Sequence, residues 1–347
     1  MTENLSLSIH LQDTRPTHRI SQTTPPIPIS RRRSCLPRLL MIFLLLLGFV
    51  GGLMAGGFVL WRWSATLPRT NLLLLGLDRR PEEGDTVRSD SMILVGLDPQ
   101  GPHVALLSIP RDLYVQIPGH GTNRINSAHF WGESDAPGGG PALAMQTVEQ
   151  NLGVTVHHYV RLDFDGFRAI VDAVGGIDVV VEETIVDDAY PTEDYGTMRI
   201  EIPTGPQHMD GETALRYVRS RHGSSDFDRA ARQQQILLGL AHHLTEPSAW
   251  PRLPLVYNAV TSAIDTDMTN GELLLLLPTI YRTGPENVAH RIIDRDMTQP
   301  WTTPTGGAVL LPRWEAIHPL VQELFTPQTH AQRWRDNIRL DNHESQQ

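Results

Sequence analysis

A set of acidic, basic and amide side chains lies at the ends of apolar or periodic segments between residues 71 and 234. They are Asp78, Arg88, Asp90, Arg111, Arg219, Arg221, Asp226, Arg229 and Gln233. Carboxylates that hold a divalent metal, with guanidiniums around them, suit a diphosphate because together they neutralise its charge. The chain contains no lysine, so every basic side chain is an arginine, whose planar fork of donors matches phosphate oxygens. The residue types therefore predict a diphosphate site, provided that the fold brings these positions together.

The last members of this set follow helical spacing. Asp226, Arg229 and Gln233 stand at i, i+3 and i+7, which is one stripe of a helix, so all three could face the same ligand. In an alternative interpretation Asp226 is only a helix N-cap and the other two residues are solvated surface. Arg219 and Arg221 are two residues apart and share a side only if the backbone there is extended.

Three short apolar runs, 71–77, 91–97 and 103–109, predict buried strands, because they are too brief for helices and lie between turn residues. Short connections would pair them as an antiparallel meander, in which the first strand ends, the second begins and the third ends at one edge. That edge would gather Asp78, Arg88, Asp90 and Arg111.

Beyond the meander, helical and strand patterns alternate. Helices are expected at 141–152, 164–173, 211–218 and 227–244, and strands at 157–162 and 177–181, with a Gly175-Gly176 turn before the last strand. Alternation of this kind places helices against a sheet. The predicted fold class is α/β, with a central mixed β-sheet covered by helices on both faces.

The segment 39–61 carries no charged residue and would form a helix of about 35 Å, long enough to cross a bilayer core of about 30 Å. A buried soluble helix is the alternative. Arginines at 31–33 and 38 precede the segment, so the positive-inside rule predicts a cytoplasmic N-terminus. The expected organisation is a disordered cytoplasmic tail (1–38), a single-pass transmembrane helix (39–61), a linker (62–70), an extracytoplasmic catalytic domain (71–325) and a polar C-terminal tail (326–347).

Composition excludes several classes of function. A net charge of −10 argues against a nucleic-acid binder, and the single cysteine, Cys35, excludes an intramolecular disulfide. The absence of lysine rules out a Walker A lysine and a Schiff base, and no HExxH or GxSxG motif is present.

Six sequence blocks resemble, in order, the LytR-CpsA-Psr family of bacterial envelope proteins. They are LGLDRR at 75–80, RSDS at 88–91, SIPRD at 108–112, RINSA at 124–128, DAVGGI at 172–177, and RSR at 219–221 followed by Asp226, Arg229 and Gln233. The resemblance covers about 71–244, and the expected N-terminal anchor matches the layout of that family.

The resemblance implies a Mg²⁺- or Mn²⁺-dependent phosphotransferase at the cell membrane. It would move an anionic, teichoic acid-like glycopolymer from a polyprenyl diphosphate carrier to peptidoglycan. The family pattern assigns the metal ligands to Asp78 and Asp90, the catalytic roles to Asp90, Arg111, Arg219 and Arg221, and diphosphate binding to Arg88, Arg111, Arg219, Arg221, Asp226, Arg229 and Gln233. Arg124 departs from the lysine that is usual in the family, which keeps the charge but not a deprotonatable amine.

Several points stay open at this level. The general base could be Asp90 or Asp112, and Phe164, Phe167, Ile170 and Val171 could line a groove for the isoprenoid chain or form ordinary core. A hydrolase acting on the same diphosphate, and a non-catalytic receptor for envelope polymer or lipid diphosphate, are alternative functions.

Overall fold

The computed structural model describes residues 48, 51–52, 54–59, 62–79, 84–101, 103–192, 196–220 and 225–326. The chain divides into two units, Met1–Met54 and Ala55–Gln347, and the fold below belongs to the second. Most of the predicted anchor 39–61, and the predicted tails apart from Thr326, lie outside the described residues. Among the helices that are described, none combines the length and apolar character that a membrane crossing requires.

The strands are β1 (Thr70–Leu77), β2 (Ser89–Asp98), β3 (His103–Ser108), β4 (Tyr114–Ile117), β5 (Gly121–Arg124), β6 (His158–Asp163), β7 (Ile177–Val181), β8 (Ile185–Pro191), β9 (Thr197–Ile202), β10 (Gly205–Met209), β11 (Ile264–Thr266), β12 (Ala289–Ile292), β13 (Thr298–Thr302) and β14 (Ala308–Pro312). The α-helices are α2 (Ser127–Asp135), α3 (Gly140–Leu152), α4 (Phe164–Val174), α5 (Gly211–Arg219), α6 (Asp226–Thr245), α7 (Leu253–Ala263), α8 (Asn270–Thr283) and α9 (Trp314–Phe325), with short 3₁₀ helices η1 (Pro247–Arg252) and η2 (Pro285–Asn287).

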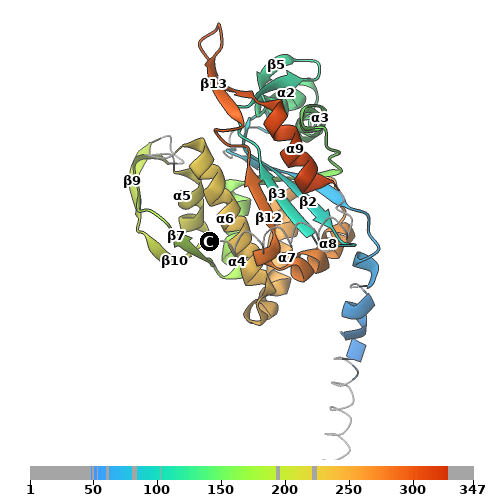
Figure 1. Ribbon diagram of the computed structural model, residues 1–347. Coiled ribbons are helices and arrows are strands. Elements are labelled where there is room, and N and C mark those ends of the chain that lie inside the picture. Colours follow the sequence, from blue (N-terminus) through green and yellow to red (C-terminus); the bar gives the residue numbers. More distant parts are fainter. Residues whose placement is uncertain are drawn as a thin grey trace, which may run out of the picture. The chain divides into compact units, whose positions relative to one another are not determined.

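Within the described residues, the central sheet has six strands in the order β11-β6-β1-β2-β3-β12 (Figure 1). β1, β2 and β3 pair antiparallel as consecutive neighbours, which confirms the predicted meander. β6 joins β1 in parallel and β12 joins β3 in parallel, so the sheet is mixed.

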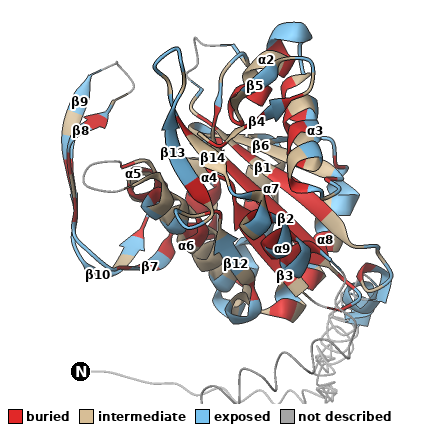
Figure 2. Cartoon of the chain, turned by 45° about the horizontal axis from the view of Figure 1, so that its top comes forward, coloured by how far each residue is buried: buried red, intermediate tan, exposed pale blue. Residues whose placement is uncertain are grey.

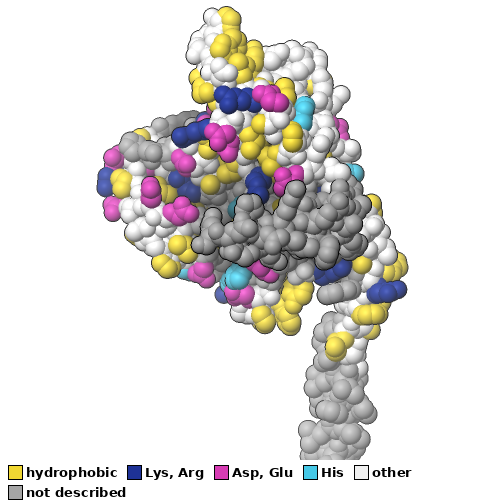
Figure 3. Space-filling model, viewed as in Figure 1, with side chains coloured by type: hydrophobic (Ala, Val, Ile, Leu, Met, Phe, Trp, Pro, Cys, Tyr) yellow, Lys and Arg dark blue, Asp and Glu magenta, His cyan; other side chains and the backbone are white. Residues whose placement is uncertain are grey.

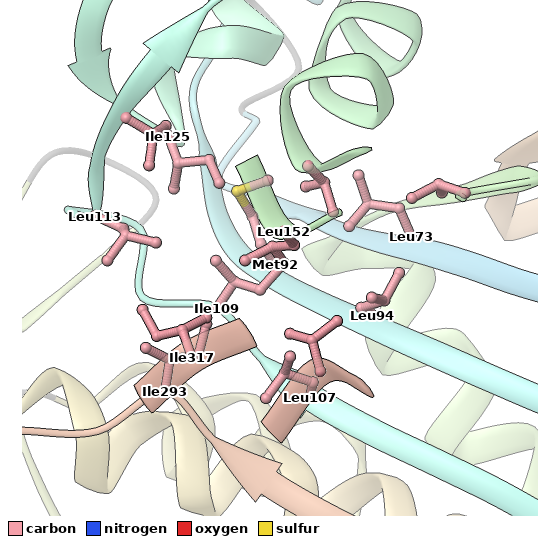
Figure 4. Packing of buried hydrophobic residues seen from close by; sticks show 14 of the residues in the cluster. Leu73, Met92, Leu94, Leu107, Ile109, Leu113, Ile125, Leu152, Ile293 and Ile317 are labelled. Carbon is pink, nitrogen blue, oxygen red and sulfur yellow. The ribbon is translucent and has the colours of Figure 1, made fainter. Parts of the chain in front are cut away.

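Alternation along the meander strands produces two hydrophobic cores. Leu73 and Leu94 belong to the core that α3 and α9 cover, which Figure 4 shows from close by. Leu72 and Ile93, one position away, belong to a second core with α8 on the opposite face. Helices therefore cover both faces of the sheet, as predicted, and the buried strands run through the middle of the molecule (Figure 2).

A third core lies beside the sheet, among β7, α4, α5 and α6. α4 begins where the Asp163 side chain accepts a hydrogen bond from the Gly166 amide, and it ends at Gly175 with φ 106°. Gly176 is also left-handed, with φ 89°, so the Gly175-Gly176 pair turns the chain into β7 as predicted. α5 likewise begins at an Asp210 cap.

Candidate active site

The edge of the meander carries the first group of predicted residues. Asp78 follows the end of β1, Asp90 lies at the start of β2, and Arg111 follows β3 after Ile109-Pro110. The Arg111 Nη1 donates to Asp90 Oδ1 at 2.8 Å. The structure therefore places these residues at one edge, as strand direction predicts.

A β-bulge shapes this edge. Gly76 pairs with Ser91 but Leu77 pairs with Ser89, so Asp90 is the extra residue on β2. A bulge bends the strand and changes the direction of the side chain that it carries. It thus contributes to the orientation of the Asp90 carboxylate.

The first turns of α6 meet the meander edge. Arg229, which is buried, lies with Nη1 2.9 Å from Asp226 Oδ1, and its Nη2 lies 3.5 Å from the Asp90 carbonyl oxygen. Arg111 Nη2 is 3.6 Å from Asp226 Oδ2. One helical turn further on, Gln233 accepts a 2.9 Å hydrogen bond from the Ser91 hydroxyl. The predicted stripe is confirmed, whereas the N-cap interpretation of Asp226 is wrong because Ser225 caps α6.

The end of α5 supplies a further guanidinium. Arg219 Nη2 is 3.4 Å from Asp78 Oδ2, and its guanidinium carbon lies 4.0 Å from the centre of the Phe164 ring. The Tyr190 hydroxyl accepts a 3.4 Å hydrogen bond from Arg219 Nη1. Ser220 has φ −55° and ψ 135°, so the backbone leaves the helix there as the Arg219 and Arg221 spacing requires, but Arg221 itself lies outside the described residues.

Arg88 does not join this cluster. It is exposed, and no hydrogen bond or ion pair links its side chain to the part of the protein that the structure describes. The strand pattern predicted the edge at which Arg88 lies but not the direction of its side chain.

A cavity of about 610 Å³ opens onto the cluster. Its polar lining residues are Asp78, Asp90, Ser91, Asp163, Asp187, Arg219, Arg229 and Gln233. Its apolar lining includes Leu74 on β1 and Val160 and Leu162 on β6, two strands that run parallel to each other. Leu74, Gly76 and Asp78 stand at i, i+2 and i+4, so the apolar wall extends back from the carboxylate along about 13 Å of strand.

The four residues named for either an isoprenoid groove or ordinary core divide between the cavity wall and the core. Phe164 and Phe167 line the cavity, whereas Ile170 and Val171 are buried and do not line it. Val171 packs in the third core with β7 and α5. The difference arises because these two residues lie one to two turns further along α4, beyond the cavity.

Burial and neighbouring charges act in opposite directions on the pKa values of two residues in this region, Arg111 and Asp112. Burial alone would lower the pKa of Arg111, but the carboxylates of Asp226, Asp90 and Asp112 outweigh it and raise that pKa. For Asp112, burial raises the pKa although Arg111 and Arg124 oppose it. On the face shown in Figure 3, arginine and acidic side chains lie next to one another below the projecting β13–β14 hairpin.

Sequence reasoning missed a group of supporting residues. The buried Ser220 donates its hydroxyl to Asp187 Oδ2 at 3.0 Å, and its carbonyl oxygen accepts from Arg232 Nη2 at 2.5 Å. Both contacts fix the segment that carries Arg219. Arg232 stands three residues after Arg229, and this spacing was the one signal in the sequence that could have found it.

The predicted metal ligands share the cavity wall, since both Asp78 and Asp90 line it. Across the described residues, no group of three or more His, Cys, Asp or Glu side chains is arranged to hold a metal ion. Magnesium in phosphoryl-transfer sites takes one or two carboxylates and completes its shell with water and substrate phosphate oxygens. The two-carboxylate donor set therefore fits a magnesium ion that binds together with a diphosphate.

Comparisons with known proteins identify relatives of this chain. The polyisoprenyl-teichoic acid–peptidoglycan teichoic acid transferase TagU of Oceanobacillus iheyensis is 35% identical over 220 residues, which cover 63% of this chain and 64% of that protein. The transferase of the same description in Bacillus subtilis, TagT, is 32% identical over 213 residues, covering 60% of this chain and 63% of that protein. The matched part thus spans less than two thirds of the length of each relative.

The fold is also that of a solved structure. The crystal structure of Bacillus subtilis TagV superposes with a TM-score of 0.62 at 28% identity, covering 75% of this chain and 99% of that chain. A model of the LytR_cpsA_psr family matches residues 65–303. These matches confirm the resemblance carried by the six sequence blocks, and the chain belongs to the LytR_cpsA_psr family.

Proposed function

We propose that this protein is a membrane-anchored phosphotransferase that moves an anionic glycopolymer from a polyprenyl diphosphate carrier to peptidoglycan, forming a phosphodiester. The observation that carries the proposal is the cavity, whose apolar interior opens onto paired carboxylates and guanidiniums. An isoprenoid chain matches the apolar part and a diphosphate matches the charged end. The relatives TagU and TagT are described as transferases of polyisoprenyl-linked teichoic acid to peptidoglycan.

Each charged residue has a role in binding and alignment. Arg219 and Arg229 would bind non-bridging oxygens of the diphosphate, and Arg111, held by Asp90 and Asp226, would stabilise the charge that develops during transfer. Arg221, which lies outside the described residues, and the exposed Arg88 are proposed to join them when substrate is bound. Gln233 and Ser91 orient one another at the wall of the cavity.

Asp78 and Asp90 would hold a Mg²⁺ ion, with Mn²⁺ as a substitute. When bound, such an ion neutralises diphosphate charge and stabilises the leaving lipid phosphate. Asp112 is proposed as the base that takes the proton of the acceptor hydroxyl, because it lies beside Arg111 and is not one of the two proposed metal ligands. The uncharged segment 39–61 would anchor this domain on the outer face of the membrane.

The decisive experiment uses the full-length chain in detergent with a polyprenyl-diphosphate oligosaccharide and peptidoglycan oligomers. We expect a coupled product that requires Mg²⁺, is lost with EDTA and returns when Mg²⁺ is added. Asp90→Ala should lower the transfer rate by at least about a hundredfold, because it removes a proposed metal ligand and the partner of Arg111. The control is Asp188→Ala, which removes an exposed carboxylate of β8 paired with Arg199 and should leave the rate unchanged.

Two results would contradict the proposal in different ways. Release of sugar phosphate without coupled product would identify a hydrolase. Full activity of Asp90→Ala would refute the assignment of the site.

A further inference from the structure

The outer face of the β4–β5 hairpin carries side chains that the diphosphate site does not use. Along β4, Val115 and Ile117 are buried in the first core, so Tyr114 and Gln116 lie on the opposite face. Directly across in register stand Arg124 and Thr122, and the Thr122 hydroxyl donates to Gln116 Oε1 at 3.0 Å. This face therefore combines an aromatic ring with amide, hydroxyl and guanidinium groups.

The β13–β14 hairpin adds a second aromatic ring. Leu310 N donates to the Asp112 carbonyl at 3.0 Å, and Arg124 donates from Nε and Nη2 to the Ala308 carbonyl at 3.1 and 2.7 Å. These bonds attach the hairpin beside β4 and β5, where Figure 1 shows it projecting. As a result the centre of the Trp301 ring lies 5.7 Å from that of Tyr114, and Trp301 remains 40% exposed.

A chain of ion pairs connects this aromatic face to the cavity. Arg124 Nε is 3.1 Å from Asp112 Oδ1, and Asp112 Oδ2 is 3.7 Å from Arg111 Nε. Arg111 in turn donates to Asp90, which lines the cavity. A ligand on the Tyr114–Trp301 face would thus lie next to the charged end of the cavity and not to its apolar part.

We propose that Tyr114, Trp301, Gln116, Thr122 and Arg124 form a subsite for a sugar ring of the acceptor glycan. The apolar face of a pyranose packs on aromatic rings, while amide, hydroxyl and guanidinium groups bind its hydroxyls. The subsite rests on the proposed function and adds to it the residues that select the acceptor.

The acceptor, and not the sugar of the donor, is the occupant because of where the subsite lies. The lipid of the donor would occupy the wall formed by β1 and β6. Phosphoryl transfer requires the attacking oxygen to approach in line with the leaving oxygen, from the side opposite to the leaving lipid phosphate. Asp112 stands between β3 and β4 and leads to Tyr114, whereas the wall for the lipid is formed by β1 and β6. In the sheet order β6-β1-β2-β3, the two lie on opposite sides of β2.

The test compares Trp301→Ala and Trp301→Phe with the wild-type full-length chain. We expect Trp301→Ala to raise the KM for peptidoglycan oligomers about tenfold with little change in kcat, and Trp301→Phe to restore most of the acceptor affinity. The dissociation constant of the polyprenyl-diphosphate oligosaccharide, measured without acceptor, should stay the same. Trp250→Ala removes another exposed tryptophan, on η1, and should leave the acceptor KM unchanged.

The outcomes separate the subsite from the overall function. If the wild type transfers sugar to peptidoglycan but Trp301→Ala has the wild-type acceptor KM, the subsite is wrong and the transferase stands. If Trp301→Ala weakens donor binding, the sugar belongs to the donor and the proposal is overturned. A fall in kcat alone, with both affinities unchanged, would indicate a merely structural role for Trp301 and would also overturn it. If the wild type transfers nothing, the proposed function fails first.

Discussion

His129 is a buried titratable residue close to the site but outside it. It is fully buried in α2, and its Nδ1 lies 2.8 Å from the Val87 carbonyl oxygen, three residues before Asp90. Arg161 Nη1 and Glu133 Oε1 face the other ring nitrogen at 3.5 and 3.9 Å. Burial lowers the pKa of His129 below 6.5, although the bond to Val87 opposes it. The folded protein thus holds a neutral imidazole that fixes the segment leading into β2.

The sign of the resulting pH dependence follows from this lowered pKa. Below about pH 6.5 the unfolded chain binds a proton at this histidine that the folded chain does not. The free energy of unfolding therefore falls by up to about 1.4 kcal/mol for each unit by which the pH decreases. His129→Gln keeps a donor for the Val87 carbonyl but cannot titrate, so its free energy of unfolding should fall less than that of the wild type between pH 7.5 and pH 5.5. Urea unfolding at these two pH values measures the difference. Exposed His290→Gln should behave as the wild type, and an equal loss in all three proteins would contradict the prediction.

Sequence alone predicted the residues whose position depends on strand direction. Asp78, Asp90 and Arg111 meet because short connections force consecutive strand ends to one edge. The contact of Arg219 with Phe164 depends instead on how α5 packs against α4, which no local pattern encodes. Arg88 shows the limit of the same rule, since the edge is fixed but the side-chain direction is not.

At the scale of elements, the N-terminus of α6 orients the cluster. Ser225 and Asp228 form a capping box, and Asp226 and Arg229 follow within the first turn. α8 begins with the same device, formed by Thr269 and Glu272. The two caps therefore provide a matched pair, because α6 contributes residues to the cavity lining and α8 contributes none.

Removing either cap should cost stability, but only one should cost activity. We expect Ser225→Ala and Thr269→Ala each to lower the free energy of unfolding by about 1 kcal/mol. Ser225→Ala should also lower kcat/KM at least about tenfold, because the first turn of α6 places Asp226 and Arg229. Chemical denaturation and the transfer assay measure the two effects. Equal kinetics in both variants would show that the cap does not position the cluster.

Elements with a strong period were predictable and short polar ones were not. The meander, α3, α4 and α6 follow apolar repeats. β5 consists of Gly-Thr-Asn-Arg, and the residues of β13 after Thr298 are exposed, so neither carries an apolar alternation. Their strands form because tertiary hydrogen bonds, such as Leu310 to Asp112, hold the hairpins in place.

At the scale of the whole molecule, the cavity reaches from the charged edge into the gap between the sheet and the third core. Val160 is half-buried on β6 and lines it. Val180, on β7, is 59% exposed and does not line it. A larger side chain at position 160 should shorten the space for an apolar chain without contacting the charged residues.

We expect Val160→Trp to reduce kcat/KM at least about tenfold for a long polyprenyl donor, since a long chain loses buried apolar area. A donor with two isoprene units should be affected less than threefold. Val180→Trp should leave both donors unchanged. Equal losses with the long and the short donor would contradict the placement of the lipid in this cavity.

The bulge at Asp90 places a constraint on chain length. Deleting one residue from 89–91 would remove the bulge, restore regular pairing and change the direction of the side chains at this edge. Substitutions in this stretch change one group at a time, whereas an insertion or deletion would move the carboxylate away from Arg111. Length variation should therefore be tolerated in the turn at Asp98–Gly101 and rejected at the start of the same strand.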